Sequence, residues 1–242
     1  MLNVIDTSKS PRKIAGMFDD IAGRYDFLNH VLSAGIDRRW RRCAIESLQL
    51  TGSETVLDIC TGTGDVAIAA LTQTPGGRRV VGVDFAPAML TVGREKLRRL
   101  RLEDRIALVR GDASRLPIGD HSADALTVAF GIRNVENVPA ACREMVRVLR
   151  AGGRLAILEF AMPTIPVFRH VYRWYLQHVL PHVGRAVSRH PDAYGYLPAS
   201  IDAFGTPADF VKILRQAGFD EVRAVSLMLG SVFLYTATRA DK

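Results

Sequence analysis

Apolar side chains follow two different spacings along this chain, and the spacing changes near residue 55. Within residues 1–50 they recur every three or four positions, the period of a helix with one buried face. From Thr55 onward, short apolar runs alternate with segments of helical period. We therefore expect a group of helices followed by alternating strands and helices, with a helical interruption at residues 161–205.

The alternation after residue 55 predicts a parallel sheet covered by helices, because a helix joins each strand to the next. Only residues 227–231 separate the last two apolar runs, which predicts an antiparallel hairpin. Strands are predicted at residues 55–59, 80–84, 106–109, 125–130, 155–160, 221–226 and 232–238. Helices are predicted at residues 66–72, 87–102, 139–149 and 207–217, with Gly152-Gly153 ending the third and Gly218 ending the fourth.

Composition places the chain in the ordinary α/β class. Its 242 residues, 48% hydrophobic and 24% charged, predict one domain over 1–242, with a helical cap at 1–50 and a helical lid at 161–205. Three well-separated cysteines predict neither disulfides nor a zinc site, and favour the cytoplasm. No apolar run reaches the roughly 20 residues of a membrane-spanning helix. The net charge of +7 permits acidic partners but selects none.

A glycine-rich loop at residues 60–65 follows the first predicted strand. Open α/β sheets bind ligands at the carboxyl ends of their strands, so this loop is a candidate site. Asp84 ends the second strand, where a carboxylate can accept hydrogen bonds from both hydroxyls of a ribose. Asp112 follows the third strand, and the backbone of Ala113 offers a donor beside it, a pair that suits the edge of an adenine ring. Three successive loops are therefore predicted to bind a nucleoside.

The glycine loop by itself fits two kinds of cofactor. Gly62-x-Gly64-x-x-Ala67, with Asp84 downstream, also matches the fingerprint of dinucleotide-binding proteins. However, no Tyr is followed four residues later by Lys, the pair used by short-chain dehydrogenases, and residues 110–117 are typical of methyltransferases. The loop lacks basic side chains for a pyrophosphate, whereas S-adenosylmethionine carries a sulfonium cation. The pattern resembles the class I S-adenosylmethionine-dependent methyltransferase fold, a Rossmann-like, mostly parallel seven-stranded sheet with an antiparallel C-terminal hairpin strand.

Two strings narrow the class further. Residues 25–40 and 130–134 closely resemble the ubiquinone/menaquinone biosynthesis C-methyltransferases, and residues 147–160 are shared more loosely with other methyltransferases. The resemblance runs from about Lys13 to Arg239. It implies a demethylmenaquinone methyltransferase that uses S-adenosylmethionine to methylate a ring carbon of a polyprenylated quinol. Demethylmenaquinol is the first choice of substrate; a methoxy-polyprenyl-benzoquinol of ubiquinone biosynthesis, or both, is the alternative.

The resemblance also implies a set of cofactor contacts, with some departures. The family often has Asn at Asp112, which keeps an acceptor, and Ser at Ala129, so a hydroxyl contact is in doubt. It usually has Met at Leu28 and His at Asp37, so Asp37 removes one proposed contact to the ring. The expected cofactor-binding residues are Asp58, Gly62, Thr63, Gly64, Asp84, Asp112, Ala113 and Ala129.

Methylation of a quinol carbon needs a nearby hydroxyl to lose its proton. A phenol has a pKa of about 10, so the site must favour the phenolate or remove the proton during attack. Arg133, just past the fourth strand, is the first candidate for stabilising that anion, and Asn134 could orient the ring oxygen. Tyr25 and Asn29 lie one helical turn apart and could share a pocket face, or merely pack and cap a helix. His190, Tyr194 and Tyr196 are weaker candidates, and no residue set has metal-ligand spacing.

The helical interruption carries aromatic and basic residues together. Arg169, Arg173 and Arg185 accompany an apolar face, a composition that suits transient contact with an anionic membrane surface, or simply a lid packed on the core. We therefore expect a cytoplasmic protein, peripheral at the inner face of the membrane. The apolar face consists of Phe168, Val171, Tyr172, Tyr175, Leu176 and Val179.

Two rival functions fit the sequence less well. A nucleic-acid methyltransferase is compatible with the basic charge, but residues 129–134 lack the Pro-Pro-Tyr-like string of amino methylation, and no Pro-Cys pair is present for cytosine methylation. We expect no nucleic-acid partner. A nucleoside-binding scaffold or a dinucleotide oxidoreductase is the second rival, which binding assays would separate. The sequence leaves the oligomeric state open, with a homodimer as one option.

Overall fold

The computed structural model describes residues 11–33, 35–73, 76–179 and 192–240. Its centre is a seven-stranded sheet with the order β3-β2-β1-β4-β5-β7-β6. The first five strands run parallel, and β7 inserts antiparallel between β5 and β6. The strands are β1 (Thr55–Ile59), β2 (Arg79–Asp84), β3 (Ile106–Arg110), β4 (Ala123–Ala129), β5 (Leu149–Phe160), β6 (Phe219–Leu227) and β7 (Val232–Arg239).

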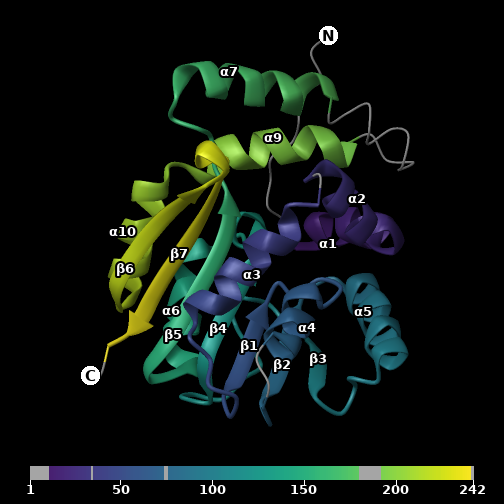
Figure 1. Cartoon of the computed structure of the whole chain (residues 1–242), viewed down its shortest axis with the longest axis vertical. Helices are drawn as coiled ribbons and strands as arrows, with labels where there is room; N and C mark the ends of the chain where they lie inside the picture. The colour runs from purple at the N-terminus through teal and green to yellow at the C-terminus, as the bar shows by residue number, and fades with distance from the viewer. Residues whose placement is uncertain (1–10, 34, 74–75, 180–191, 241–242) are drawn as a thin grey trace.

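Helices cover both faces of the sheet (Figure 1). Alternate strand residues point to opposite faces, so each face buries its own apolar cluster. One cluster is completed by α6 (Val138–Val148) and α10 (Pro207–Ala217), and the other by α3 (Asp37–Ser47), α4 (Asp65–Thr72) and α5 (Pro87–Leu100). The fold class predicted from the sequence is confirmed, including the antiparallel hairpin.

Two helical groups lie over the carboxyl edge of the parallel strands β1–β5, whose arrows point upward in Figure 1. They fall within the predicted cap and lid segments. The cap group consists of α1 (Pro11–Ile21), η1 (Ala22–Arg24) and α2 (Tyr25–Leu32). The lid group consists of α7 (Pro166–Trp174), the π-helical turn η3 (Tyr175–Val179) and α9 (Asp192–Phe204), with η4 (Met228–Gly230) of the hairpin beside it. The last short element, η2 (Ile132–Asn134), follows β4.

One predicted boundary is wrong. The pair Gly152-Gly153 does not end α6, which stops at Val148 and passes directly into β5. The two glycines lie inside β5, next to an irregularity in its pairing with β4. Glycine pairs often end helices, but here the first residue of β5, Leu149, pairs with Ala123 of β4 and sets the transition earlier.

Candidate active site

The loop between β1 and α4 is supported from beneath. Gly64 takes left-handed backbone angles, with a φ of 84°, at the N-cap of α4, a conformation that glycine adopts without steric cost. Below the loop, the carboxylate of Asp58 accepts hydrogen bonds from the hydroxyls of Thr61 at 2.5 Å and Thr127 at 2.7 Å. Burial raises the pKa of Asp58 to about 6, against those two hydrogen bonds. Asp58 therefore holds the loop and is not among the residues lining the cleft above it.

Asp84 stands at the carboxyl end of β2 and faces this cleft. Its Oδ2 accepts a hydrogen bond from the backbone amide of Gly62 at 2.7 Å, and its Oδ1 accepts one from the amide of Ala86 at 2.9 Å. Burial raises the pKa of Asp84, against these backbone hydrogen bonds. A carboxylate oxygen has more than one lone pair, so Asp84 can accept from ribose hydroxyls while it still holds the loop.

The cleft lies over the ends of β1, β2, β3 and β4, and α1 closes its outer side. Its acidic wall residues are Asp84, Asp112 and Glu136, and the described residues that line it include no Lys or Arg. Of the sequence-predicted cofactor residues, those that line the cleft are Gly62, Asp84, Asp112, Ala113 and Ala129. The α1 side chains that face it are Ile14, Ala15 and Phe18.

Thr63 and Gly64 belong to the loop but are not among the residues that line the cleft. The hydroxyl of Thr63, a residue only 2% exposed, donates to Asp26 at 2.5 Å and accepts from the ammonium of Lys96 at 2.9 Å. Because Asp26 belongs to α2 and Lys96 to α5, Thr63 connects the glycine loop to α2 of the cap and to α5. A contact of Thr63 with the cofactor stays a prediction, and its hydroxyl has a supporting role in the structure.

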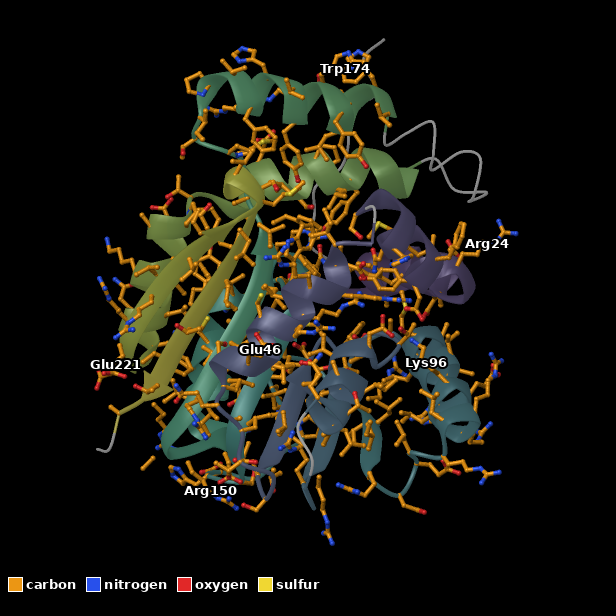
Figure 2. All side chains as sticks on the ribbon, in the orientation of Figure 1. Arg24, Glu46, Lys96, Arg150, Trp174 and Glu221 are labelled. Carbon is orange, nitrogen blue, oxygen red and sulfur yellow. The ribbon has the colours of Figure 1, made fainter. Side chains whose placement is uncertain are left out.

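Thr63 contacts a larger set of charged residues that we call the cap–loop ion cluster: Asp26, Arg41, Asp65 and Lys96. The Nζ of Lys96 lies 2.5 Å from Asp26 and 2.6 Å from Asp65, and Arg41 lies 2.8 Å from the other oxygen of Asp65. Burial alone would raise the pKa of Asp65, but the charges of Arg41 and Lys96 outweigh it and hold the pKa below its ordinary value. Four helices thus meet at the glycine loop, with Lys96 at the top of α5 in Figure 2.

A second, larger pocket of about 520 Å³ adjoins the cleft. Phe18, Tyr25 and Phe130 line both cavities and form their common wall. The part formed by α2 and α3 is polar, whereas the part formed by the lid is apolar and aromatic. The polar wall residues from the cap side are Asn29, Ser33, Asp37 and Arg41, and the lid contributes Phe168, Val171, Tyr172, Tyr175, Leu176, Tyr196 and Leu197.

Arg133 lies in the wall of this second pocket and is 6% exposed. Its Nη1 donates to Glu159 and to the carbonyl of Phe130, both at 2.6 Å, and its Nε donates to Ser200 at 3.3 Å. The other oxygen of Glu159 accepts the backbone amide of Arg133 at 3.1 Å. These contacts fix the orientation of the guanidinium, and Glu159 balances its charge in the buried site. Glu159, fully buried, is a site residue that sequence reasoning missed.

The remaining candidates lie around the common wall. Asn134 lines the cofactor cleft and accepts a hydrogen bond from the hydroxyl of Tyr196 at 3.1 Å. Tyr25 and Asn29 do share a pocket face. Burial raises the pKa of Tyr25, against a hydrogen bond from Asn29 and the charges of Arg133 and Arg41, so its hydroxyl stays protonated at neutral pH. His190 and the side chain of Tyr194 lie outside the described residues.

An aromatic wall was also missing from the sequence-based site. Phe130 and Phe160 stack with their ring centroids 4.5 Å apart, and Trp40 packs on Phe130 at 6.0 Å. The guanidinium of Arg133 lies 5.3 Å from the centroid of Phe160. The available signal was position, because Phe130 and Phe160 each come at the carboxyl end of a strand. Such a wall suits a flat, conjugated ring.

Neither a metal cluster nor a membrane span emerges from the residues the structure describes. Within those residues, no group of three or more His, Cys, Asp or Glu side chains could hold a metal ion. Among the described helices, none is long and apolar enough to cross a bilayer.

Comparison with known proteins agrees with this site. A chain from Geobacter sp. (strain M21), named ubiquinone/menaquinone biosynthesis C-methyltransferase UbiE, is 45% identical over 96% of this chain and 98% of its own. A demethylmenaquinone methyltransferase of Porphyromonas gingivalis is 41% identical over 92% and 91%. The fold is that of a solved SAM-dependent methyltransferase from Aquifex aeolicus, with a TM-score of 0.61 at 19% identity over 82% and 88% of the two chains. The ubiE/COQ5 methyltransferase family model matches residues 6–239, and the chain belongs to that family.

Proposed function

We propose that this protein transfers the methyl group of S-adenosylmethionine to a ring carbon of a polyprenylated quinol. The observation that carries the proposal is the meeting of two unlike cavities at Tyr25 and Phe130. One is an acid-lined cleft at the strand ends, and the other has an aromatic wall and a buried cation, Arg133. The relatives described above are named as quinone methyltransferases, and this chain matches them along nearly their whole length.

The charges of the cleft fit this cofactor better than a dinucleotide. Asp84, Asp112 and Glu136 line it without a described basic side chain, so a pyrophosphate would be repelled and a sulfonium cation attracted. We assign the ribose hydroxyls to Asp84 and the adenine edge to Asp112 with Ala113, all of which line the cleft. Ala129 lines the cleft without a hydroxyl, so the contact that a family serine would make is absent here.

The chemistry that the bound cofactor supplies is an electrophilic methyl group. Arg133 stabilises the negative charge that develops on the ring oxygen, because its guanidinium is fixed and poorly hydrated. Asn134 and the protonated hydroxyl of Tyr25 orient that oxygen at the wall between the cavities. Phe130 and Phe160 hold the ring flat and exclude water. Asn134 and Tyr25 donate hydrogen bonds to the ring oxygen and Arg133 carries positive charge, so none of these three side chains takes up a proton.

We propose demethylmenaquinol as the substrate and a methoxy-polyprenyl-benzoquinol as the alternative, because the names of the relatives include both menaquinone and ubiquinone biosynthesis. The deciding experiment is mass spectrometry of quinones from cells that lack this protein. Accumulation of a demethylated naphthoquinone supports the first substrate, and accumulation of a demethylated benzoquinone supports the alternative. Normal quinones in the deletion strain, together with no methyl transfer by the purified protein to either quinol, would reject the function.

The apolar side of the second pocket opens on a surface that suits the isoprenoid tail and a membrane. Val171 and Met228 line the pocket and are also 56% and 47% exposed, so they mark its mouth. Around this mouth lie the exposed side chains of Val167, Trp174 and Leu229, and Trp174 points outward at the top of Figure 2. Arg169 and Arg173 on the same helix add positive charge. The ring would thus enter the pocket while the tail stays in the lipid.

Vesicle co-sedimentation tests this docking surface. The protein is expected to bind vesicles containing anionic phosphatidylglycerol weakly, and to lose them as salt is raised. Trp174→Ala with Val171→Ser should abolish the binding. Val225→Ser, which removes an equally exposed apolar side chain from β6, is the matched control and should bind normally. Absence of wild-type binding to anionic vesicles at low salt would rule out the docking surface.

A further inference from the structure

The proposed reaction releases a proton inside a buried pocket. The ring exchanges a C–H bond for a C–CH₃ bond, and the sulfonium cation becomes a neutral thioether, so one proton leaves the site for each methyl group transferred. Tyr25, Asn134 and Arg133 do not take up this proton, as argued above. Glu159 already accepts three hydrogen bonds, two from Arg133 and one from the amide of Phe160. A proton acceptor and a route to solvent are therefore still required.

Asp37 is the only carboxylate among the described residues that line the second pocket. It lies in the first turn of α3 and is 4% exposed. Its Oδ1 accepts a hydrogen bond from the hydroxyl of Ser33 at 2.9 Å and lies 3.3 Å from Nδ1 of His30, while its Oδ2 lies 3.0 Å from Arg41. Asp37 thus touches the pocket on one side and an imidazole on the other.

His30 connects this carboxylate to the outside. The side chain of His30 is 44% exposed, against 5% for that of Asp37. The imidazole packs on Gly35, where a Cβ would approach Cε1 of His30 to 3.0 Å, so glycine leaves room for the ring. The family that this chain resembles usually has His at position 37, whereas this chain has Asp37 there, with Nδ1 of His30 3.3 Å from its carboxylate.

We propose that Asp37 is a catalytic residue that accepts the proton of the quinol hydroxyl, and that His30 passes this proton to solvent. The proposal rests on the quinol methyltransferase function proposed above. The O–H bond breaks as the proton moves to the Asp37 carboxylate, and its electron pair makes the ring carbon nucleophilic. The carbon attacks the methyl group, the carbon–sulfur bond breaks, and the ring becomes aromatic again when the C–H proton returns to oxygen. His30 takes the first proton from Asp37 and releases it to water.

Several charges around the pair influence this transfer. Arg41 on α3 faces Asp37 directly and is itself held by Asp65 on α4, which Lys96 on α5 contacts in turn. Arg133 on η2 and Tyr25 on α2 line the same pocket. Imidazole side chains exchange protons readily near neutral pH, so the release step should shape the pH profile of turnover.

The test compares purified variants acting on demethylmenaquinol and S-adenosylmethionine. Asp37→Asn should lower kcat about a hundredfold, as expected for loss of a general base, while calorimetry shows unchanged cofactor affinity. Asp37→Glu should recover part of that loss. His30→Gln should lower kcat about tenfold, with little effect on KM, and its pH profile of turnover should differ from that of the wild type.

Added imidazole separates a proton route from a structural contact. It should restore the kcat of His30→Gln in proportion to its concentration, because the side chain of His30 is 44% exposed and a small base can reach Asp37 from solvent, and should not restore Asp37→Asn. His121→Gln, which changes an exposed histidine that contacts Arg239 on β7, is the control and should match the wild type.

The result that overturns the proposal is a His30→Gln enzyme with the wild-type pH profile or with a loss that imidazole does not repair. If Asp37→Asn fails to bind the cofactor, the imidazole series on His30→Gln still decides. If the wild type methylates neither quinol, the proposed function fails, and this outcome is distinct because it needs no variant.

Discussion

The two cavities of the site are built in different ways. The cofactor cleft is made mainly from backbone loops that leave the ends of four neighbouring strands, so the hydrogen-bonded sheet sets its shape. The second pocket is made mainly from side chains of α2, α3, α7 and η3, which meet only through tertiary packing. The comparison teaches that cofactor recognition belongs to the sheet, whereas substrate recognition belongs to the helices placed over it.

The charges of the two cavities differ in the same way. The cleft has three acids and, among its described residues, no base. The second pocket is lined by Arg41, Arg133 and one acid, Asp37, which pairs with Arg41. A cationic methyl donor and an anionic ring thus each meet opposite charge. Changes in one cavity should therefore alter one binding event and leave the other intact.

The largest expected effect is the removal of Arg133. Arg133→Met alone would leave Glu159 as an unpaired buried charge, which costs about 3–5 kcal/mol of stability. We therefore combine Arg133→Met with Glu159→Gln. The double variant should lose turnover on the order of a thousandfold, because the ring oxygen loses its fixed cation. Calorimetry should show cofactor affinity close to that of the wild type. Equal loss of both, or of neither, contradicts the assignment.

The second effect concerns the cleft. Asp84→Asn keeps the shape of the side chain but loses the charge that faces the ribose. A hydrogen bond to a charged group contributes about 1.5–3 kcal/mol, and Asn keeps one of the two acceptor oxygens, so losing one such bond should weaken cofactor binding on the order of ten- to a hundredfold. With saturating cofactor, KM for the quinol should change little. A change confined to the quinol KM would refute the division between the cavities.

The third effect is a pH dependence of the free energy of unfolding, caused by Asp58 beneath the cleft. The pKa of Asp58 is raised by burial from its ordinary value of 3.8 to about 6 in the folded protein. A raised pKa means that the native state binds the proton more tightly than the unfolded state does. The associated stability is therefore present below about pH 4 and is lost as the pH rises through about 6.

Urea unfolding at several pH values measures this effect. Relative to Asp58→Asn, the wild type should lose about 3 kcal/mol between pH 4 and pH 7, since one pKa unit corresponds to about 1.4 kcal/mol. Asp209 is a control of opposite sign, because hydrogen bonds from Thr206 lower its pKa. Its contribution is therefore gained, not lost, as the pH rises. Parallel curves for the wild type and Asp58→Asn would disprove the assignment.

The smallest expected effect sharpens the comparison, because it should reach both cavities. Lys96 joins Thr63 behind the glycine loop to Asp26 of α2. Lys96→Met leaves Asp26 and Asp65 facing each other without their cation, which should loosen the cap. Cofactor affinity and quinol KM should each worsen several-fold. Arg99→Met on the same helix, whose side chain is 80% exposed, should change neither. A loss in only one cavity would show that the cluster does not couple them.

The cofactor half of the site could be predicted closely from the sequence. Asp84 and Asp112 follow strands directly, and the rule that ligands bind at the carboxyl ends of strands places them together. The same local reasoning put Asp58 and Thr63 against the cofactor, although the structure turns both side chains beneath the loop. A motif gives the position of a residue along the chain, but not the side of the loop on which its side chain lies.

The second pocket could be predicted only in part. Arg133 and Tyr25 were found through family strings, but their partners come from distant segments. Glu159 contacts Arg133 from the neighbouring strand β5, and Met228 reaches the pocket from the hairpin turn. The prediction that Gly152-Gly153 ends a helix was wrong for a similar reason, because pairing with β4 overrides the local preference of glycine. These contacts depend on tertiary packing, which a single sequence does not encode in its spacing.

The position of β7 has a consequence for synthesis on the ribosome. This strand follows every other strand along the chain, yet it lies between β5 and β6. During translation the edge of β5 therefore stays unpaired, and β6 has no strand to pair with, until β7 emerges. Unpaired edges bind other chains, so the nascent protein passes through an aggregation-prone stage that ends when one late strand closes both gaps.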